Sequence, residues 1–233
     1  MTLPPRAITL DLDDTLWPVL PVIERAEQAL QDWLHEHAPR TARRFPIQAM
    51  RALRERVAHE RRDLAHDYTE QRRISLRMAL EAGGEDTALV DPAFEVFIDA
   101  RNRVELFPDV PEALARIARR VPVAGLTNGN ADLARIGLDR HFAFNLAARE
   151  HGEAKPEPGI FLAACQRLSL PPEQVLHVGD HPEFDVLGAR RAGLMSCWMN
   201  RVGGDWPSTD HHPHIEVDDL AALADWLDAA HTD

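Results

Sequence analysis

Three short apolar segments of this chain each end in polar residues, and segments with helical character separate them. They are AITLDL at residues 7–12, PVAGLTN at 122–128 and VLHVGD at 175–180. Apolar runs of this length that contain β-branched residues are typical of strands buried on both faces of a sheet. Strands that alternate with helices along a chain form a parallel sheet. We therefore expect an α/β fold, with a doubly wound, Rossmann-like parallel sheet and helices on both of its faces.

Further elements after residue 106 continue this alternation. Apolar runs at 142–147 and 194–199 predict two more strands. Apolar residues at helical spacing predict helices over residues 109–120, 131–138, 158–168, 182–192 and 218–230. The last of these helices begins with carboxylates, which is the charge that a helix N-terminus favours.

The region between Pro18 and Leu106 shows no convincing strand. Its apolar residues recur at helical spacing and predict amphipathic helices over residues 22–34, 51–64, 72–82 and 91–105. We expect residues 18–105 to form a helical insert, whereas residues 1–17 and 106–233 form the core that contains the sheet. An insert after the first strand would lie over the carboxyl ends of the strands, where folds of this class bind ligands.

The charge of the chain argues against nucleic acid as a partner. The formal net charge is -12, and phosphate backbones are held mainly by basic patches. Between Arg40 and Arg77, however, there are eleven arginines and only five acidic residues, a local excess of six positive charges. An arginine-rich helical surface exposed to solvent and a surface that binds an anion would both have this composition.

Cys165 and Cys197 lie in apolar segments and predict no disulfide framework, which agrees with a reducing cytoplasm. No apolar leader precedes the first predicted strand, and no run approaches the length needed to span a membrane. We expect a cytoplasmic protein without a membrane partner, present as a monomer or a weak dimer.

Acidic residues gather at the ends of two predicted strands. Asp11 and Asp13 are two residues apart in an extended segment and therefore share one face. Asp180 ends another segment, and Asp185 follows five residues later. Carboxylates collected at neighbouring strand ends repel one another unless a cation neutralises them, and hard oxygen ligands suit Mg²⁺. The alternative is that these acids are N-caps that open helices.

Thr127, Asn128 and Gly129 follow the second predicted strand and precede a helix. A hydroxyl, an amide and a turn that glycine permits can together hold a phosphate group. Because Asn-Gly is also an ordinary turn, the three residues carry weight only in combination with the acidic strand ends. That combination favours a site for phosphate and metal at one edge of the sheet.

Four segments, in this order, resemble the motifs of haloacid dehalogenase-like (HAD) phosphohydrolases. Residues 11–16, DLDDTL, resemble motif I, and residues 126–129, LTNG, resemble motif II. Lys155-Pro156 resembles motif III, and residues 179–185, GDHPEFD, resemble motif IV. The resemblance covers the whole core, and the insert resembles the helical C1-type cap of the phosphatase branches. It implies the HAD fold and a Mg²⁺-dependent phosphatase that acts on a small phosphate monoester.

The resemblance implies a mechanism with an aspartyl-phosphate intermediate. Asp11 would attack phosphorus, and Asp13 would protonate the leaving alcohol and then deprotonate the hydrolytic water. Thr15 would orient Asp13 through its hydroxyl. Mg²⁺ would be bound by Asp11, the backbone carbonyl of Asp13 and Asp180, with Asp185 as an outer support. The dehalogenases of the family lack an aspartate at the position of Asp13 and need no metal, so we do not expect carbon–halogen hydrolysis.

Lys155 is the only lysine of the chain, and every other member of the 26 Lys and Arg residues is an arginine. The resemblance places its ammonium group between the phosphate and Asp11, where the broad planar fork of an arginine would crowd the site. By the same resemblance, Thr127 and the amides around Asn128 and Gly129 would hold phosphoryl oxygens.

The substrate is expected to depend on the insert. Residues 66–80, HDYTEQRRISLRMAL, resemble the cap of a bacterial branch that acts on flavin mononucleotide and on the phosphorylated aminoribitylamino-uracil precursor of riboflavin. Trp17 lies where the hinge to the cap is expected, and it either packs there or stacks on a flavin or another base. The cap residues that could point at the leaving group are Asp67, Thr69, Arg72 and Arg73. A helix N-terminus with exposed arginines is the alternative for these four.

Other functions are compatible with the same scaffold. Nucleoside monophosphates and sugar or glycolate phosphates are alternative substrates. A binding or regulatory protein with vestigial catalysis belongs to a different class and would not require the complete set of acids and the lysine. The intact motifs therefore favour the enzyme.

The histidines suggest no separate site. His177 lies inside a predicted strand and is expected to be a core residue, whereas His181 could reach the rim of the site. His211, His212 and His214 stand among Pro, Ser and Thr residues, which indicates a loop, with a metal site as the alternative.

Overall fold

The computed structural model describes residues 4–207 and 211–230. Its contacts divide the chain into two compact units. The first unit comprises the described residues of Met1–Pro18, Glu105–Gly129 and Leu133–Asp233. The second comprises Val19–Val104 and Asn130–Asp132.

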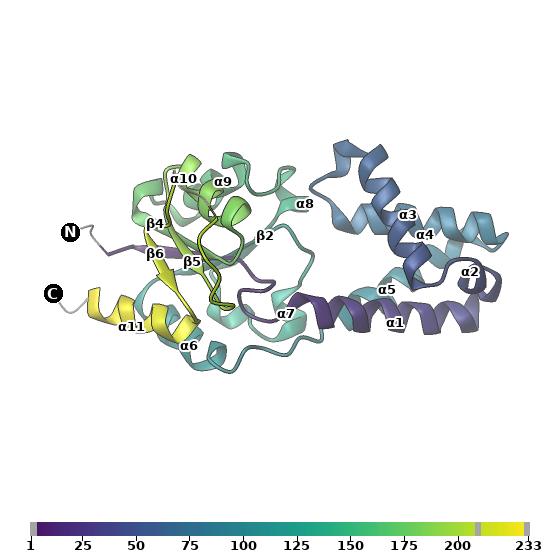
Figure 1. Ribbon diagram of the computed structural model, residues 1–233, viewed down its shortest axis with the longest axis horizontal. Helices are drawn as coiled ribbons and strands as arrows, with labels where there is room; N and C mark the ends of the chain where they lie inside the picture. Colours follow the sequence, from purple (N-terminus) through teal and green to yellow (C-terminus); the bar gives the residue numbers. More distant parts are fainter. Residues whose placement is uncertain (1–3, 208–210, 231–233) are drawn as a thin grey trace. The chain divides into compact units, whose positions relative to one another are not determined.

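The first unit contains a six-stranded parallel sheet with the strand order β3-β2-β1-β4-β5-β6 (Figure 1). The strands are β1 (Ala7–Leu10), β2 (Val123–Thr127), β3 (Phe144–Ala147), β4 (Val175–Gly179), β5 (Met195–Met199) and β6 (Ile215–Val217). Every residue of β1, β2 and β4 is buried, which explains their continuous apolar sequences. The expected doubly wound α/β fold is confirmed.

The strand order determines where a ligand site can form. β1 pairs with β2 on one side and with β4 on the other, so the order of the strands reverses next to β1. The carboxyl ends of β1 and β4 are adjacent at this point, and open α/β sheets bind ligands at such a reversal. The topology therefore brings the acids that follow β1 close to those that follow β4.

Helices pack on both faces of the sheet (Figure 1). On one face, Phe161 of α9 and Ala189 of α10 join an apolar core with residues of β2, β3 and β4. On the other face, Arg116 of α6 pairs with Asp225 and Asp228 of α11. The helices of this unit are α6 (Val110–Arg120), α7 (Leu133–Ile136), α8 (Ala148–His151), α9 (Pro158–Leu168), α10 (Gly188–Arg191) and α11 (Leu220–Ala230), with a π-helical turn (Pro182–Leu187) and 3₁₀ turns at Asp139–His141 and Pro172–Gln174.

Three local features differ from the sequence-based expectation. β6 is a strand that no sequence pattern predicts, because three residues at the edge of the sheet are too few to show a period. The segment 182–192 begins with a π-helical turn before α10 instead of forming one helix. The segment 131–138 retains only the short helix α7.

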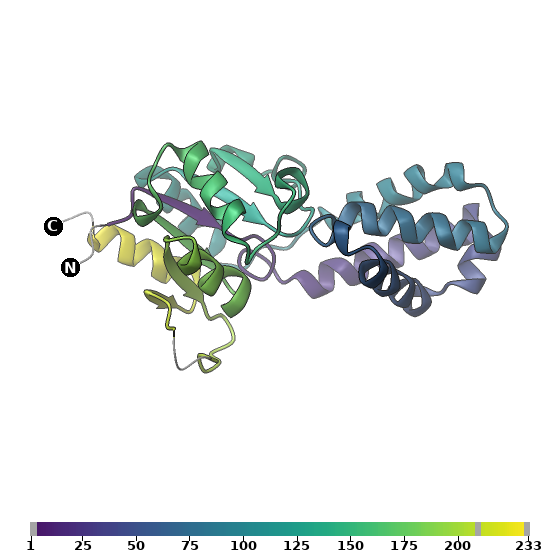
Figure 2. The same cartoon turned by 90° about the horizontal axis from the view of Figure 1, so that it is seen from above.

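The second unit is helical throughout its regular structure (Figure 2). Its helices are α1 (Val19–His37), α2 (Pro39–Arg44), α3 (Ile47–Glu60), α4 (Tyr68–Gly83) and α5 (Val90–Arg101), with 3₁₀ turns at Arg62–Leu64 and Thr87–Leu89. Their apolar faces share one core, which includes Leu34, Leu76 and Phe97. Among the described residues, no helix of either unit is both long and apolar enough to cross a membrane.

Candidate active site

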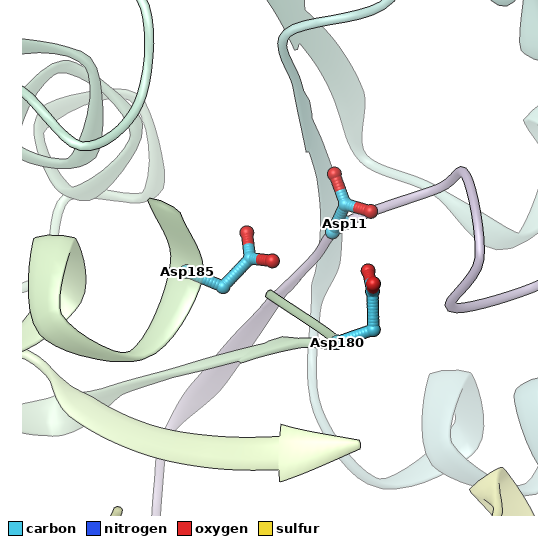
Figure 3. Close-up of side chains that lie close together, drawn as sticks. All are labelled: Asp11, Asp180 and Asp185. Atoms are coloured by element: carbon cyan, nitrogen blue, oxygen red, sulfur yellow. The ribbon is translucent and has the colours of Figure 1, made fainter. Parts of the chain in front are cut away.

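Three carboxylates converge at the carboxyl ends of β1 and β4 (Figure 3). Asp11 directly follows β1, Asp180 directly follows β4, and Asp185 lies on the π-helical turn after β4. One oxygen of each carboxylate lies within 4.8 Å of the others, and the three side chains lie close together (Figure 3). The structure thus brings together three of the four acids that the sequence assigned to a metal site, and a metal contact of Asp13 stays a prediction.

Lys155 supplies the positive charge of this cluster. Its Nζ donates to Asp11 Oδ1 at 2.5 Å and to Asp185 Oδ1 at 2.6 Å. The side chain is only 3% exposed. Burial acts to lower the pKa of Lys155, but the charges and hydrogen bonds of Asp11 and Asp185 outweigh burial and raise it. The ammonium group is therefore charged and restrained at neutral pH.

Asp185 accepts hydrogen bonds from three donors, which are Lys155 Nζ, His177 Nε2 at 3.0 Å and the backbone N of His181 at 2.9 Å. Burial would raise the pKa of this carboxyl, but Lys155 and His177 hold it below its ordinary value. The space for it depends on Gly179, where an added Cβ would lie 2.2 Å from Asp185 Cγ. Asp185 is therefore an ionised, fully bonded support of the cluster.

His177 is buried inside β4, as expected for a core histidine, but it also contacts the site. Its Nε2 lies 3.0 Å from Asp185 Oδ1, and its Nδ1 lies 2.8 Å from Thr9 Oγ1. Burial lowers the pKa of His177. Because an ionised carboxylate only accepts hydrogen bonds, the neutral ring carries its proton on Nε2 and accepts from Thr9 at Nδ1.

The remaining two acids carry charge that has no full compensation within the cluster. Burial is the main cause that raises the pKa of Asp11; Lys155 opposes it, and Asp185 and Asp180 add to it. Burial, together with repulsion from Asp185, raises the pKa of Asp180 to about 7. Three carboxylates around one ammonium fit a divalent cation, because oxygen ligands of this kind bind such ions and lose their mutual repulsion.

The segment after Asp11 folds back on itself. Leu16 N donates to Leu12 O, and Asp14 N donates to Trp17 O, both at 2.8 Å. This turn places the Trp17 indole beside Asp13, and its Nε1 donates to Asp13 Oδ1 at 2.8 Å. The indole is 0% exposed. Such burial favours packing over stacking for this ring, and a contact of Trp17 with substrate stays a prediction.

The hydroxyl of Thr15 does not contact Asp13 in this structure, contrary to expectation. It lies 3.4 Å from Asp11 Oδ2 and 3.3 Å from Asp180 Oδ1. The reason is geometric. The turn directs the Thr15 hydroxyl toward the acidic cluster and places the Asp13 carboxyl beside the Trp17 indole. The indole N–H, not the threonine hydroxyl, orients the Asp13 carboxyl.

Asn128 fixes the backbone of Lys155. Its Nδ2 donates to Lys155 O at 2.9 Å, and its Oδ1 accepts from Lys155 N at 2.8 Å. The adjacent Gly129 N donates to Thr127 Oγ1 at 2.9 Å. The segment that resembles motif II therefore positions the lysine, and its contact with phosphoryl oxygens stays a prediction.

Two further residues support the site without having been predicted for it. Trp198, at the end of β5, donates from Nε1 to Asp180 O at 2.8 Å. Arg201 donates from Nε to Thr15 O at 3.0 Å and makes two 3.0 Å hydrogen bonds to Asp109. One signal in the sequence could have identified Trp198 and Arg201. They lie at or just after the end of a predicted strand, and the site lies at that edge of the sheet.

The cap residues named from the sequence have contacts within the second unit. Asp67 is the N-cap of α4 and accepts from Glu70 N at 2.9 Å. Thr69 Oγ1 accepts from Asn130 Nδ2 at 3.3 Å. Arg73 pairs with Asp91 at 2.8 Å, whereas Arg72 is buried. Their contact with a substrate stays a prediction.

The other histidines have structural contacts. His181 Nδ1 accepts from the backbone N of Glu183 and of Phe184, at 3.2 and 3.1 Å. His214 Nδ1 accepts from Ser196 N at 3.0 Å. Within residues 4–207 and 211–230, the one cluster of potential metal ligands is Asp11, Asp180 and Asp185, and no histidine belongs to it.

Comparison with known proteins agrees with this geometry. The family model of haloacid dehalogenase-like hydrolases matches residues 5–193. The chain belongs to this family. In the HAD family, its relatives include the 5-amino-6-(5-phospho-D-ribitylamino)uracil phosphatase YigB of Escherichia coli (strain K12), which is 34% identical over 93% of this chain and 94% of that protein. A phosphoserine phosphatase of Thermus thermophilus is 37% identical over 62% of this chain and 60% of that protein.

Among solved structures, a 2-haloacid dehalogenase from Pseudomonas syringae pv. Tomato DC3000 superposes on this HAD chain with a TM-score of 0.90. It is 39% identical, and the match covers 96% of this chain and 98% of the other. The relatives of this HAD hydrolase thus carry the names of two reactions, one at phosphorus and one at carbon.

Proposed function

We propose that this protein is a divalent-metal-dependent phosphomonoesterase, with Mg²⁺ as the metal, that acts through an aspartyl-phosphate on a small phosphorylated metabolite. The observation that carries the proposal is the pair of Asp11, bonded to Lys155, and Asp13, held by Trp17, beside the acidic cluster. A nucleophile, an acid and base, and a site for a cation are the parts that phosphoryl transfer needs.

Asp11 is the nucleophile of the proposed reaction. Lys155 holds Asp11 Oδ1 and balances part of its charge, which reduces the repulsion between the carboxylate and the phosphate. Attack on phosphorus forms the acyl phosphate and breaks the bond to the leaving oxygen. Asp11 and Asp180, with Asp185 behind them, would hold the metal, which would neutralise charge on the phosphoryl group.

Asp13 serves as the acid and then as the base. Trp17 donates a hydrogen bond to Asp13 Oδ1 and so orients the carboxyl group that gives the leaving alkoxide its proton. The same carboxyl group then takes a proton from the water that hydrolyses the acyl phosphate. One oriented carboxyl group therefore serves both steps.

Carbon–halogen hydrolysis is the second candidate, since the similar Pseudomonas syringae structure is that of a 2-haloacid dehalogenase. A halide ion is a very weak base and leaves without a proton, whereas an alkoxide needs one. Halide displacement needs a nucleophile such as Asp11, but it needs neither an oriented Asp13 nor a cation held by two further acids. These groups favour the phosphatase.

For the substrate, we propose flavin mononucleotide or a phosphorylated riboflavin precursor. The support is the 34% identity with the Escherichia coli uracil-precursor phosphatase over nearly the full length of both chains. Nucleoside monophosphates and sugar or glycolate phosphates remain the alternatives within the same reaction class.

Assays of phosphate release and of halide release, made on the same enzyme samples, test the proposed reaction. Wild type and Asp11→Asn are incubated with p-nitrophenyl phosphate, flavin mononucleotide, the riboflavin precursor, nucleotides and sugar phosphates, with Mg²⁺ or with EDTA; 2-chloropropionate is the halide substrate. We expect phosphate release that requires Mg²⁺ and Asp11, with the flavin-related substrates highest in kcat/KM. Release of chloride, or no release above Asp11→Asn, would overturn the proposed reaction. A poor rank for the flavin-related substrates would overturn only the substrate.

A further inference from the structure

The second unit contains a buried cation that has no counter-ion. Arg72 lies on α4 and is 6% exposed. Its Cζ lies 3.6 Å from the centroid of the Phe97 ring on α5. Among the described residues, its guanidinium makes no hydrogen bond and no ion pair, in contrast to the usual pairing of buried arginines.

Other positive charges surround it. Arg54 of α3, Arg101 of α5 and Arg51 of α3 all act to lower the pKa of Arg72. The carboxylate that opposes them is Glu27 of α1, and Glu27 already pairs with Arg51 at 2.6 Å. Arg51, Arg54 and Arg72 stand against this one carboxylate, so these four side chains together carry an excess of positive charge.

The excess charge is present at neutral pH. Burial, with repulsion from Arg54 as the next cause, lowers the pKa of Arg72 to about 9. The group still carries its proton at pH 7. Burial of a charge without a partner costs free energy, so the protein is more stable when an anion occupies this position. In addition, Arg54 Nε is buried and has no hydrogen-bond partner.

The neighbouring residue shows that this situation is specific to one position. Arg73 follows Arg72 in α4, and its Cζ also lies over an aromatic ring, that of Phe94, at 4.8 Å. Arg73, however, pairs with Asp91 at 2.8 Å and is partly exposed. Two adjacent arginines with aromatic partners therefore differ in that the partly exposed one pairs with a carboxylate, whereas the buried one does not.

We propose that Arg72, together with Arg54, forms an anion-binding site within the second unit. Its ligand is a small oxyanion with paired oxygens, such as a free carboxylate, sulfate or phosphate ion, because a planar guanidinium binds such pairs with two parallel hydrogen bonds.

Thermal unfolding with sulfate as the probe tests the site itself. Wild type, Arg72→Met and the matched control Arg73→Met are melted in HEPES buffer with increasing sodium sulfate, against sodium chloride of equal ionic strength. A bound ligand gives a shift that follows its occupancy, whereas general salt effects act on all three proteins alike. We expect a sulfate-specific rise in Tm of about 3 °C at tenfold excess over Kd for wild type and Arg73→Met, and loss of that rise for Arg72→Met.

Two outcomes of this experiment would contradict the anion-binding site. Equal sulfate responses in all three proteins, or no response in any, would show that Arg72 binds no oxyanion. If Arg72→Met does not fold by circular dichroism, Arg54→Met at the partly exposed neighbour replaces it. Its sulfate response should then be reduced, and a response equal to that of wild type overturns the proposal.

Discussion

Each unit of this protein buries a cation, and the two cations differ in what surrounds them. In the unit with the sheet, Lys155 contacts Asp11 and Asp185 within 2.6 Å. In the cap unit, Arg72 contacts an aromatic ring and is flanked by other arginines. The two side chains are nearly equally buried, at 3% and 6% exposure. The degree of burial alone therefore does not predict the role of a charged side chain.

The difference follows from what each cation has to bind. Lys155 is compensated within the protein, so its free energy of burial is already offset before any ligand arrives. Its function is to hold Asp11 in place. Arg72 lacks that compensation, and an arriving anion would supply it. A cation with partners positions a catalytic group, whereas a cation without partners is suited to binding a ligand.

The same substitution at the two cations should have opposite effects on stability. We expect Lys155→Met to lower the free energy of unfolding by about 3–5 kcal/mol in metal-free buffer, because it leaves Asp11 and Asp185 buried without their counter-ion. Arg72→Met should be neutral or stabilising in anion-poor buffer, since it removes an uncompensated charge. Urea unfolding of both variants measures the difference. Equal losses at the two positions would invalidate the comparison.

Lys155→Arg sharpens the comparison by keeping the charge and changing only its shape. The ammonium fits between two carboxylates at 2.5 and 2.6 Å, and a planar guanidinium is too broad for that space. We expect kcat/KM for phosphate release to fall about 100-fold or more. Arg43→Lys is the control, because Arg43 is exposed and has no assigned role in the site. Turnover near that of wild type would mean that charge alone suffices at position 155.

Sequence reasoning recovered the polar residues at strand ends but not the contacts between distant residues. The acids of the cluster were predictable, because parallel strands place their carboxyl ends at one edge. The roles of Trp17 and Thr15 were not, because they depend on the backbone turn between residues 12 and 17. His177 looked like a core residue because its contact with Asp185 depends on a π-helical turn that no apolar pattern marks.

The distinction between Arg72 and Arg73 was partly available in the sequence. Arg72 is spaced four and eight residues before Leu76 and Leu80, which are both buried, so it lies on the buried stripe of α4. Arg73 lies off that stripe. The missing information was that no carboxylate pairs with Arg72, since this depends on how four helices pack.

Trp17→Phe tests whether the hydrogen bond from Trp17 positions Asp13 in the way that Lys155 positions Asp11. The variant keeps most of the apolar volume and removes the N–H that orients Asp13. We expect kcat/KM for an alkyl phosphate to fall about tenfold, because the leaving alkoxide needs the Asp13 proton. For p-nitrophenyl phosphate the loss should be below about threefold, since nitrophenolate leaves without protonation.

The comparison between leaving groups separates positioning from general damage. Trp33→Phe is the control, because Trp33 lies in the cap unit and stacks on His37. Equal losses with both substrates would assign Trp17 a purely structural role.

Asp109→Asn is expected to have the smallest effect. It removes the ion pair between Asp109 and Arg201, which is less buried than the pair of Lys155 and Asp11. Burial raises the pKa of Asp109, but hydrogen bonds from Arg201 and from Leu220 N outweigh it and hold the pKa below 3.8. A lowered pKa contributes stability that is present above the unfolded value and is lost as the pH falls through the folded value. We expect the variant to lose about 1 kcal/mol at pH 7 and to approach wild type as the pH falls below about 4. Urea unfolding from pH 7 to pH 3 measures this convergence. A loss of stability that does not depend on pH would show that packing, not charge, stabilises this region, in which Arg201 also donates to Thr15 O.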